Sequence, residues 1–308
     1  MILILLSACR DDLAGSTQAD TVADETAPYL GETDADAPPS FNSADVASAV
    51  EDAITLIRQI NAQPVVSVYS QLMSQIDNTC PLWTDNDGYP LWYDACTSDS
   101  GVTFEGYGLT VDWTGQDDGT GITWWGTQLI SVSTIVDAES QTFTAGGGAG
   151  SLQGVQAYTG VEIFYSYIEG GYSWDGPEAD GTWLDWGVEP TLVWYASRDP
   201  SSGGKAITLS SSVTIDSGPF TAVFMDGVYL YEEVLGSSCG IEPSGTISLL
   251  DSEGRWTDLI FDGPTEFNAE VDAAVCDGCA TAWYRGTALG EACIDFSALT
   301  DWEDSPWE

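Results

Sequence analysis

Short runs of β-forming residues, separated by turn-forming residues, dominate the chain from Cys80 onward. Val, Ile, Thr, Tyr, Phe and Trp fill these runs, and Gly, Asp and Ser recur between them. Such spacing predicts many short strands. No strand–helix–strand alternation follows Cys80, so successive strands should pair antiparallel. The sequence therefore predicts a mainly β protein with one antiparallel sheet, built as a sandwich, an open meander or a partly closed barrel.

Several segments define the expected strands more closely. Residues 130–136, 161–167 and 207–215 alternate apolar and mostly polar side chains. Because successive side chains of a strand point to opposite faces, each segment predicts a strand with one apolar side. Asp226 with Gly227, and residues 251–254, have the composition of hairpin turns. They predict two hairpins within the sheet.

A short N-terminal helical hairpin is expected before the sheet, within residues 43–78. Apolar residues repeat at helical spacing from Ser43, the expected N-cap, to Asn61. A second helix is expected over residues 65–76, where apolar side chains share one face. The two helices should pack as a hairpin against the sheet.

The β domain is expected to span residues 79–299. Residues 146–150 are four glycines and one alanine. Their small side chains predict a flexible joint and a subdomain edge at this point. Residues 300–308 are acidic and should form a frayed tail.

The residues Leu6, Ser7, Ala8 and Cys9 follow a short apolar run. This stretch resembles the lipobox of bacterial lipoproteins, in which a signal peptide is cleaved before the cysteine, which is then lipidated. The resemblance implies that residues 1–8 are a signal-peptide remnant and that acylated Cys9 reaches the lipid bilayer. The apolar run is shorter than the usual roughly 7–15 residues and no basic residue precedes it. A start placed too late would produce this departure.

Residues 9–42 have the composition of a tether. Eight acidic residues and no basic residue lie between Asp11 and Asp36. Low hydrophobicity and like charge predict a solvated, extended segment. No apolar run after Cys9 approaches the roughly 18 residues that a membrane-spanning helix needs. We therefore expect a cell-envelope protein that is anchored by lipid and faces the periplasm or the exterior.

The general plan of the chain supports a second resemblance. An acylated cysteine, an acidic tether, short helices and cysteine-linked strands resemble uncharacterised acidic surface lipoproteins of deltaproteobacteria. Residues 80–104, with Cys80 and Cys96 on either side of Asp87 and Gly88, carry most of this resemblance. It implies no activity.

Six cysteines follow Cys9, and an even number in an exported chain predicts disulfide bonds. Two pairs lie symmetrically about a glycine, Gly88 for one and Gly286 for the other. A hairpin that turns at that glycine brings the two cysteines opposite each other, and the remaining two cysteines are left to pair. The predicted bonds are Cys80–Cys96, Cys239–Cys276 and Cys279–Cys293.

The charge of the chain excludes several functions. The net charge is −43, from 49 acidic and 6 basic residues. This charge repels phosphate backbones, so no nucleic-acid partner is expected. Such acidity also fits adaptation to salt. The chain has no histidine, which excludes Ser-His-Asp and Cys-His catalytic pairs and His-ligated zinc.

Three motifs resemble redox, metal or phosphate sites, but their sequences favour a structural role. Cys276 and Cys279 have the spacing of a redox or zinc motif, but neither the fold pattern nor a second close pair accompanies them. Residues 85–88 begin like a calcium loop but lack its later ligands. Residues 198–205 lack the first glycine of a phosphate loop. No cofactor, no metal and no catalytic residue are therefore expected.

Tryptophans and carboxylates alternate in residues 169–194. Aromatic rings beside carboxylates bind sugars by stacking and hydrogen bonding, and paired carboxylates can hydrolyse glycosides. The alternative is that these tryptophans fill the core. The candidate ligand-binding residues are Trp174, Asp175, Trp183, Asp185, Trp186 and Trp194.

These observations favour a non-catalytic, envelope-anchored lipoprotein that acts as a surface structural or binding module. Its partner would be a polysaccharide or an envelope protein. The alternative is a carbohydrate-binding or glycoside-cleaving lipoprotein that uses residues 169–194.

Overall fold

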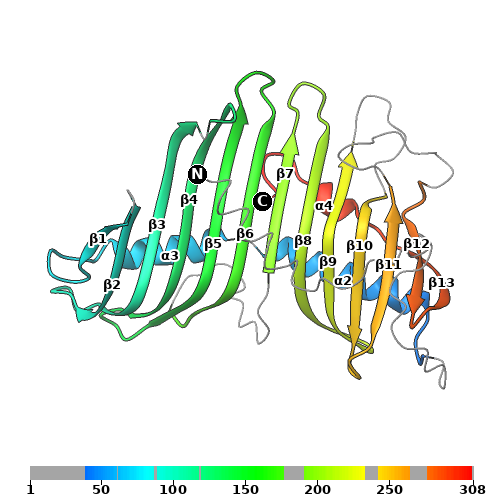
Figure 1. Cartoon of the computed structure of the whole chain (residues 1–308), viewed down its shortest axis with the longest axis horizontal. Coiled ribbons are helices and arrows are strands. Elements are labelled where there is room, and N and C mark those ends of the chain that lie inside the picture. Colours follow the sequence, from blue (N-terminus) through cyan, green and yellow to red (C-terminus); the bar gives the residue numbers. More distant parts are fainter. Residues whose placement is uncertain are drawn as a thin grey trace, which may run out of the picture.

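The computed structural model describes residues 39–60, 62–86, 89–117, 119–176, 191–232, 242–263 and 276–306. Within these ranges, thirteen strands form one antiparallel sheet, and each strand pairs with its neighbours in the sequence (Figure 1). The sheet is an open meander, which is one of the three arrangements that the sequence allows. None of the helices in these ranges is long and apolar enough to cross a membrane.

The strands are β1 (Trp83–Asn86), β2 (Tyr89–Thr97), β3 (Thr103–Asp117), β4 (Ile122–Val136), β5 (Thr142–Gln156), β6 (Glu162–Trp174), β7 (Thr191–Arg198), β8 (Lys205–Ser217), β9 (Phe220–Glu232), β10 (Ser244–Asp251), β11 (Trp256–Asp262), β12 (Cys279–Tyr284) and β13 (Thr287–Cys293). The helices are α2 (Ser43–Gln59), α3 (Gln63–Met73) and α4 (Ser297–Thr300).

One of the two predicted hairpin turns is confirmed and the other is wrong. Residues 251–254 turn between β10 and β11 as expected. Asp226 and Gly227 instead lie inside β9, where the pairing with both β8 and β10 shifts in register. Gly227 has a φ of 57°. A β-bulge and a two-residue turn can both require a positive φ, so the same dipeptide serves either structure.

The glycines at residues 146–150 do not form a joint or a subdomain edge. They lie in the middle of β5, which pairs without interruption with β4 and β6. A β-carbon at Gly148 or Gly150 would lie 3.0 Å or 2.3 Å from the ring of Tyr167 in β6. The glycines are therefore strand residues that leave space for an aromatic ring on the neighbouring strand.

The first helix begins at Ser43, the residue that was predicted to be its cap. Asn42, not Ser43, is the N-cap of α2: its side chain accepts from the backbone of Ala44, 2.8 Å away, and of Asp45. Asp45 accepts in turn from the backbone of Asn42, which completes a capping box. Phe41 is buried and packs edge-on against Phe220. The predicted tether of residues 9–42 therefore ends before Phe41.

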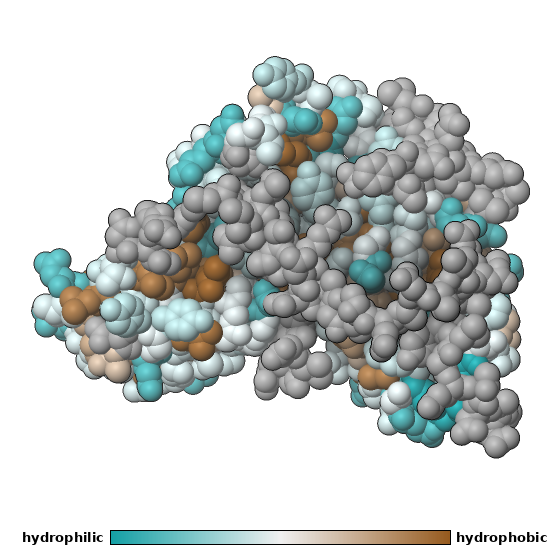
Figure 2. Space-filling model, in the orientation of Figure 1, coloured by the Kyte–Doolittle hydropathy of each residue, from teal (hydrophilic) through white to brown (hydrophobic). Residues whose placement is uncertain are grey.

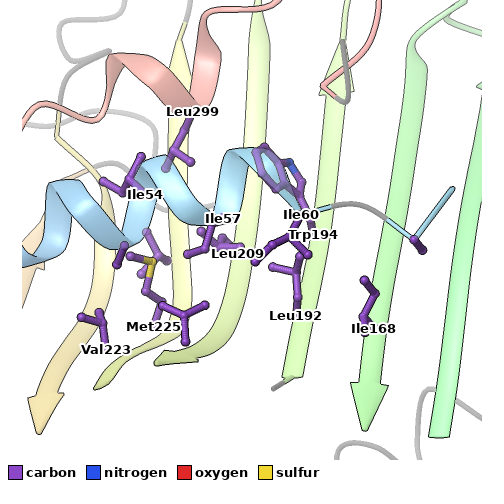
Figure 3. Close-up of a cluster of buried hydrophobic side chains, with 14 of the residues drawn as sticks. Ile54, Ile57, Ile60, Ile168, Leu192, Trp194, Leu209, Val223, Met225 and Leu299 are labelled. Carbon is purple, nitrogen blue, oxygen red and sulfur yellow. The ribbon is translucent and has the colours of Figure 1, made fainter. Parts of the chain in front are cut away.

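The two expected helices are present, but they do not pack as a hairpin. They follow one another across one face of the sheet and contact different strands (Figure 1). Helix α2 contacts β8, β9, β12 and β13, whereas α3 contacts β4 and β5. Figure 3 shows Ile57 of α2 near Leu209 of β8, and Ile54 near Leu299 of α4, all of them buried. Full burial of such side chains stabilises a fold by about 1.5–3 kcal/mol each.

Residues 300–306, the described part of the acidic C-terminal segment, are held on the sheet rather than frayed. Trp302 is only 4% exposed, and its ring meets that of Phe164 edge-on at 5.5 Å. The ammonium group of Lys205 lies 4.9 Å from the Trp302 ring centroid and donates to the carbonyl oxygen of Thr300 at 2.6 Å. Burial of Trp302 explains why this acidic segment stays on the sheet.

Two arginines also hold this segment, residues 294–306, which we call the C-terminal strap. Arg58 of α2 donates to the carbonyl oxygen of Pro306. Arg198 of β7 pairs with Asp304 at 3.4 Å and with Glu162 of β6. Hydrogen bonds from charged groups to the backbone are stronger than those between neutral groups, so the scarce basic residues contribute to the tertiary structure here.

The structure contains two of the three predicted disulfides. Cys80–Cys96 links the two ends of the β1–β2 hairpin, and Cys279–Cys293 links β12 to β13. Cys276 is also disulfide-bonded, and its predicted partner, Cys239, lies outside the described residues. The symmetric spacing about a turn was sufficient to identify the two local bonds.

The packing of the glycines against Tyr167 can be tested with a matched pair of variants. A β-carbon at Gly171 would meet no atom within 4 Å, in contrast to one at Gly150. We expect Gly150→Ala to lower the free energy of unfolding by about 1–3 kcal/mol, because the ring or the backbone must move. Gly171→Ala should change it by less than about 0.5 kcal/mol. Urea unfolding followed by circular dichroism measures both, and equal stabilities would contradict this packing.

Candidate functional site

The two faces of the sheet are covered unequally. All three described helices lie on one face, behind the strands in Figure 1, and they appear in front in the opposite view of Figure 3. We call the other side, which carries Tyr93 of β2, Tyr107 of β3 and Val132 of β4, the helix-free face. Figure 2 has the orientation of Figure 1 and shows hydrophobic atoms, in brown, toward the β2–β4 end of the sheet.

Strands β4 and β6 direct their predicted apolar side to the helix-free face. The alternation in residues 130–136 and 161–167 is present, but Ile130 and Val132 are 37% and 46% exposed. The opposite side of β4 faces α3 and carries buried Ser131 and other small or apolar residues. Alternation shows which residues share a face; it does not show which face the helices cover.

The side of the sheet beneath α3 is closed by a buried polar network. The indole nitrogen of Trp92 donates to the hydroxyl of Tyr69 at 2.7 Å, and Ser131 donates to the carbonyl oxygen of Tyr107 at 3.0 Å. Burial raises the pKa of Tyr69 to about 12. A β-carbon at Gly108 would lie 2.2 Å from the Tyr69 hydroxyl. These groups hold α3 to the sheet, so the accessible site must be sought on the other face.

A row of residues crosses five strands on the helix-free face. Direct register pairs join each member to the next, from β2 to β6. We call this row the platform; it consists of Tyr93, Tyr107, Val132, Gly146 and Gly171. The two tyrosines are 63% and 42% exposed. Because strands lie about 4.8 Å apart, the platform is roughly 19 Å long.

Apolar residues border the platform on one side. The next row in register toward the top of Figure 1 contains Leu91, Leu109 and Ile130. Only Ile130 of these three is largely exposed. These side chains support the aromatic rings and make the β2–β4 end of the face apolar.

Polar residues border the platform on the other side. The adjacent row in register continues from Glu105 of β3 through Thr134 and Thr144 to Ser173 of β6. We call these four residues the polar row. Three of them are exposed and Thr134 is half-buried. A carboxylate accepts hydrogen bonds and a hydroxyl can both donate and accept, so this edge can bind a polar ligand.

The helix-free face carries acidic but no basic side chains on the strands that the structure describes. Arg198 and Lys205 pair in register and point toward the helices and the C-terminal strap. Arg255 and Arg285 lie in the turns after β10 and β12. With Glu105 and Glu169 exposed, this face is electrostatically unfavourable for anions.

Three of the six predicted Trp/acid residues, Trp174, Asp175 and Trp194, lie within the described residues. Trp194 is fully buried, with the Arg58 guanidinium 5.6 Å from its ring centroid. Trp174 is half-buried and packs against the core. Asp175 is exposed and accepts from the backbone of Thr142. Trp183, Asp185 and Trp186 lie outside the described residues. Among the candidates that can be placed, the two tryptophans pack with the core.

Many aspartates in the described chain are used as turn caps. The carboxylates of Asp77, Asp137, Asp199 and Asp251 each accept at least one backbone N–H from their own turn. Such Asx-type bonds favour aspartate in turns. No group of three or more metal-ligating side chains occurs in the described ranges. Part of the acidity of the chain therefore has a structural role.

One buried carboxyl was not identified from the sequence. Glu242 is fully buried and accepts from the backbone of Asp277 at 2.9 Å. Burial, together with neighbouring Asp262, raises the pKa of Glu242. The hydrogen bond between Asp277 and Glu242 links the start of β12 to the start of β10. Nothing in the local sequence distinguishes Glu242 from the many other acidic residues.

Comparisons with known proteins give no relative for this chain. A scan against protein-family models, a search of curated proteins and a search of solved structures each found no match. Function is therefore inferred from the platform, the polar row and the sequence itself.

The turn caps predict a specific loss of stability in acid. The hydroxyl and backbone of Thr79, with the backbone of Asp99, lower the pKa of Asp77 from 3.8 to about 2. A carboxyl with a lowered pKa stabilises the fold above about pH 4, and this contribution is lost as the pH falls toward 2. Asp77→Asn should therefore be less stable than the wild type at pH 6, with a smaller difference at pH 2.5.

Urea unfolding at pH 6, 4 and 2.5 measures this difference. Asp226→Asn, at an exposed position in β9, controls for the removal of one negative charge. A stability difference between Asp77→Asn and the wild type that stays constant over this pH range would show that the carboxylate bonds are not responsible.

Proposed function

We propose that the protein is a non-catalytic lipoprotein of the cell envelope that binds a partner through the helix-free face of its sheet. The observation that carries this proposal is the exposure of Tyr93, Tyr107, Ile130 and Val132 on one contiguous part of that face. Monomeric proteins rarely expose contiguous apolar patches without a functional reason. The lipobox-like residues 6–9 support the anchor.

The chemistry of the chain supports binding rather than catalysis. The whole sequence contains no histidine, the side chain most often used for general acid–base catalysis near neutral pH. The platform has aromatic and aliphatic side chains at its centre, and exposed carboxylates border it at Glu105 of β3 and Glu169 of β6. These strands are three positions apart in the sheet, about 14 Å, which exceeds the roughly 5–9.5 Å between the two carboxyl groups of glycoside hydrolases. Glycoside hydrolysis normally requires two carboxyl groups on opposite sides of the bond that is cleaved.

The anchor predicts the location and the mass of the native protein. Wild-type protein should fractionate with membranes, start at Cys9 and carry acyl chains, whereas Cys9→Ser should be released in soluble form. Reduction should add about six daltons, two for each of three disulfides. Cell fractionation and intact mass spectrometry measure these outcomes. Membrane retention of Cys9→Ser equal to that of the wild type would contradict the lipid anchor.

The binding face predicts the effect of removing its aromatic rings. In the soluble Cys9→Ser form of the full chain, Tyr93→Ala combined with Tyr107→Ala should weaken co-sedimentation with isolated cell envelopes by at least about tenfold. The control is Tyr158→Ala, because Tyr158 is 93% exposed in the turn between β5 and β6. Equal binding by the two proteins, with their melting temperatures unchanged, would exclude the helix-free face as the binding surface.

A further inference from the structure

We infer that the partner of the platform is an uncharged glycan chain that lies across strands β2 to β6. This inference rests on the proposed function, which makes the helix-free face the binding surface, and it specifies the chemical class of the ligand. The platform and the polar row are adjacent, parallel and in register. They offer the two kinds of surface that a sugar chain requires.

The aromatic end of the platform matches the apolar faces of sugar rings. Tyr93 and Tyr107 are cross-strand partners on β2 and β3, so their β-carbons are about 4.5–5.5 Å apart. Both side chains are substantially exposed. A tyrosine presents a flat apolar ring with a polar hydroxyl at its tip, which allows stacking on a pyranose ring and a hydrogen bond to its hydroxyls.

The polar row lies where the hydroxyl groups at the edge of a stacked sugar would point. Glu105 is two residues from Tyr107 and Thr134 is two residues from Val132, so each is the neighbour of a platform residue on the same face. Thr144 and Ser173 continue this border on β5 and β6. Hydroxyl and carboxylate groups can satisfy sugar hydroxyls as both donors and acceptors. An apolar protein patch would gain nothing from this border.

The glycine end of the platform leaves space for a chain to continue. Gly146 and Gly171 face each other across β5 and β6. A β-carbon at Gly171 would meet no atom within 4 Å, and one at Gly146 would meet only the carbonyl oxygen of Gly171, at 3.6 Å. At this end of the platform, the surface is therefore formed by the backbone of the two glycines. A linear chain can pass over it toward β6 without a steric barrier from these two positions.

The charge of the face selects for an uncharged glycan. The described strands place Glu105 and Glu169 on the helix-free face and no lysine or arginine. Anionic polysaccharides would be repelled by these groups and by the net charge of −43. A basic protein is the competing partner, because it would also be attracted by this charge. The experiment below separates the two.

The test begins with isolated cell envelopes and the full-length chain in its soluble Cys9→Ser form, so that no lipid anchor contributes to binding. One sample is oxidised with periodate, which cleaves the vicinal diols of sugars, and a second is digested with a broad protease. We expect periodate to abolish co-sedimentation and protease to leave it unchanged. Loss of binding after protease, with retention after periodate, would overturn the glycan and leave the binding face standing. Absence of binding to untreated envelopes would contradict the proposed function itself.

Two variants then separate stacking from hydrogen bonding. Thr134→Val with Thr144→Val removes two hydroxyls from the polar row and keeps β-branched side chains in both strands. Binding to a glycan should weaken by at least about fivefold, whereas an apolar protein partner would bind equally well or more tightly. Circular dichroism melting shows whether the variant is folded. If it is not, the single variant Thr144→Val, at an exposed position, is used instead.

Defined probes complete the experiment. Cellohexaose, laminarihexaose and maltohexaose are titrated in isothermal calorimetry, with Lys–Val alternating peptide as the basic competitor. Binding of any one hexasaccharide that is lost in Tyr93→Ala with Tyr107→Ala, and kept in Tyr158→Ala, supports the inference. Binding of the peptide alone, with the same dependence on the two tyrosines, would overturn it.

Discussion

The packing of α2 and α3 on one side of the sheet is the interaction on which the rest of the structure depends. A thirteen-stranded meander is held together by contacts between neighbouring strands, and these contacts alone bury little apolar surface. Helix α2 lies over β8 and β9 and buries Ile54 and Ile57, whereas α3 lies over β4 and β5. Because both helices cover the same face, Tyr93, Tyr107, Ile130 and Val132 on the other face remain exposed. The exposure of the face that we propose for binding is therefore a consequence of the position of the helices.

Local features of the fold could be predicted from the sequence, and features that depend on distant segments could not. The helix pair, the strand at residues 207–215 and two disulfides follow from patterns within about twenty residues. The orientation of β4 and β6 does not, because alternation assigns residues to two faces and α3 decides which face is covered. Asp226 and Gly227 were misinterpreted because a bulge and a turn need the same backbone conformation.

The candidate site was harder to predict than the fold. The composition of residues 169–194, rich in tryptophan and carboxylates, predicts a sugar-binding site. Trp194, however, is fully buried in the core. The platform draws one residue from each of five strands, and its members are separated by up to 78 positions between Tyr93 and Gly171. Only the register of the sheet brings them into one row. The available sequence signal was the alternation in residues 130–136, which marks the exposed side.

The scarcity of basic residues has a consequence for proteolysis outside the cell. Proteases that cleave after lysine or arginine have five target residues in the described chain, and four of them are engaged in ion pairs, hydrogen bonds or contacts with aromatic rings. These four are Arg58, Arg198, Lys205 and Arg255. The fifth, Arg285, lies in the turn between β12 and β13, inside the loop closed by Cys279–Cys293. A cut there would leave both halves covalently joined, so the described part of the chain offers trypsin-like proteases few sites at which cleavage would separate it.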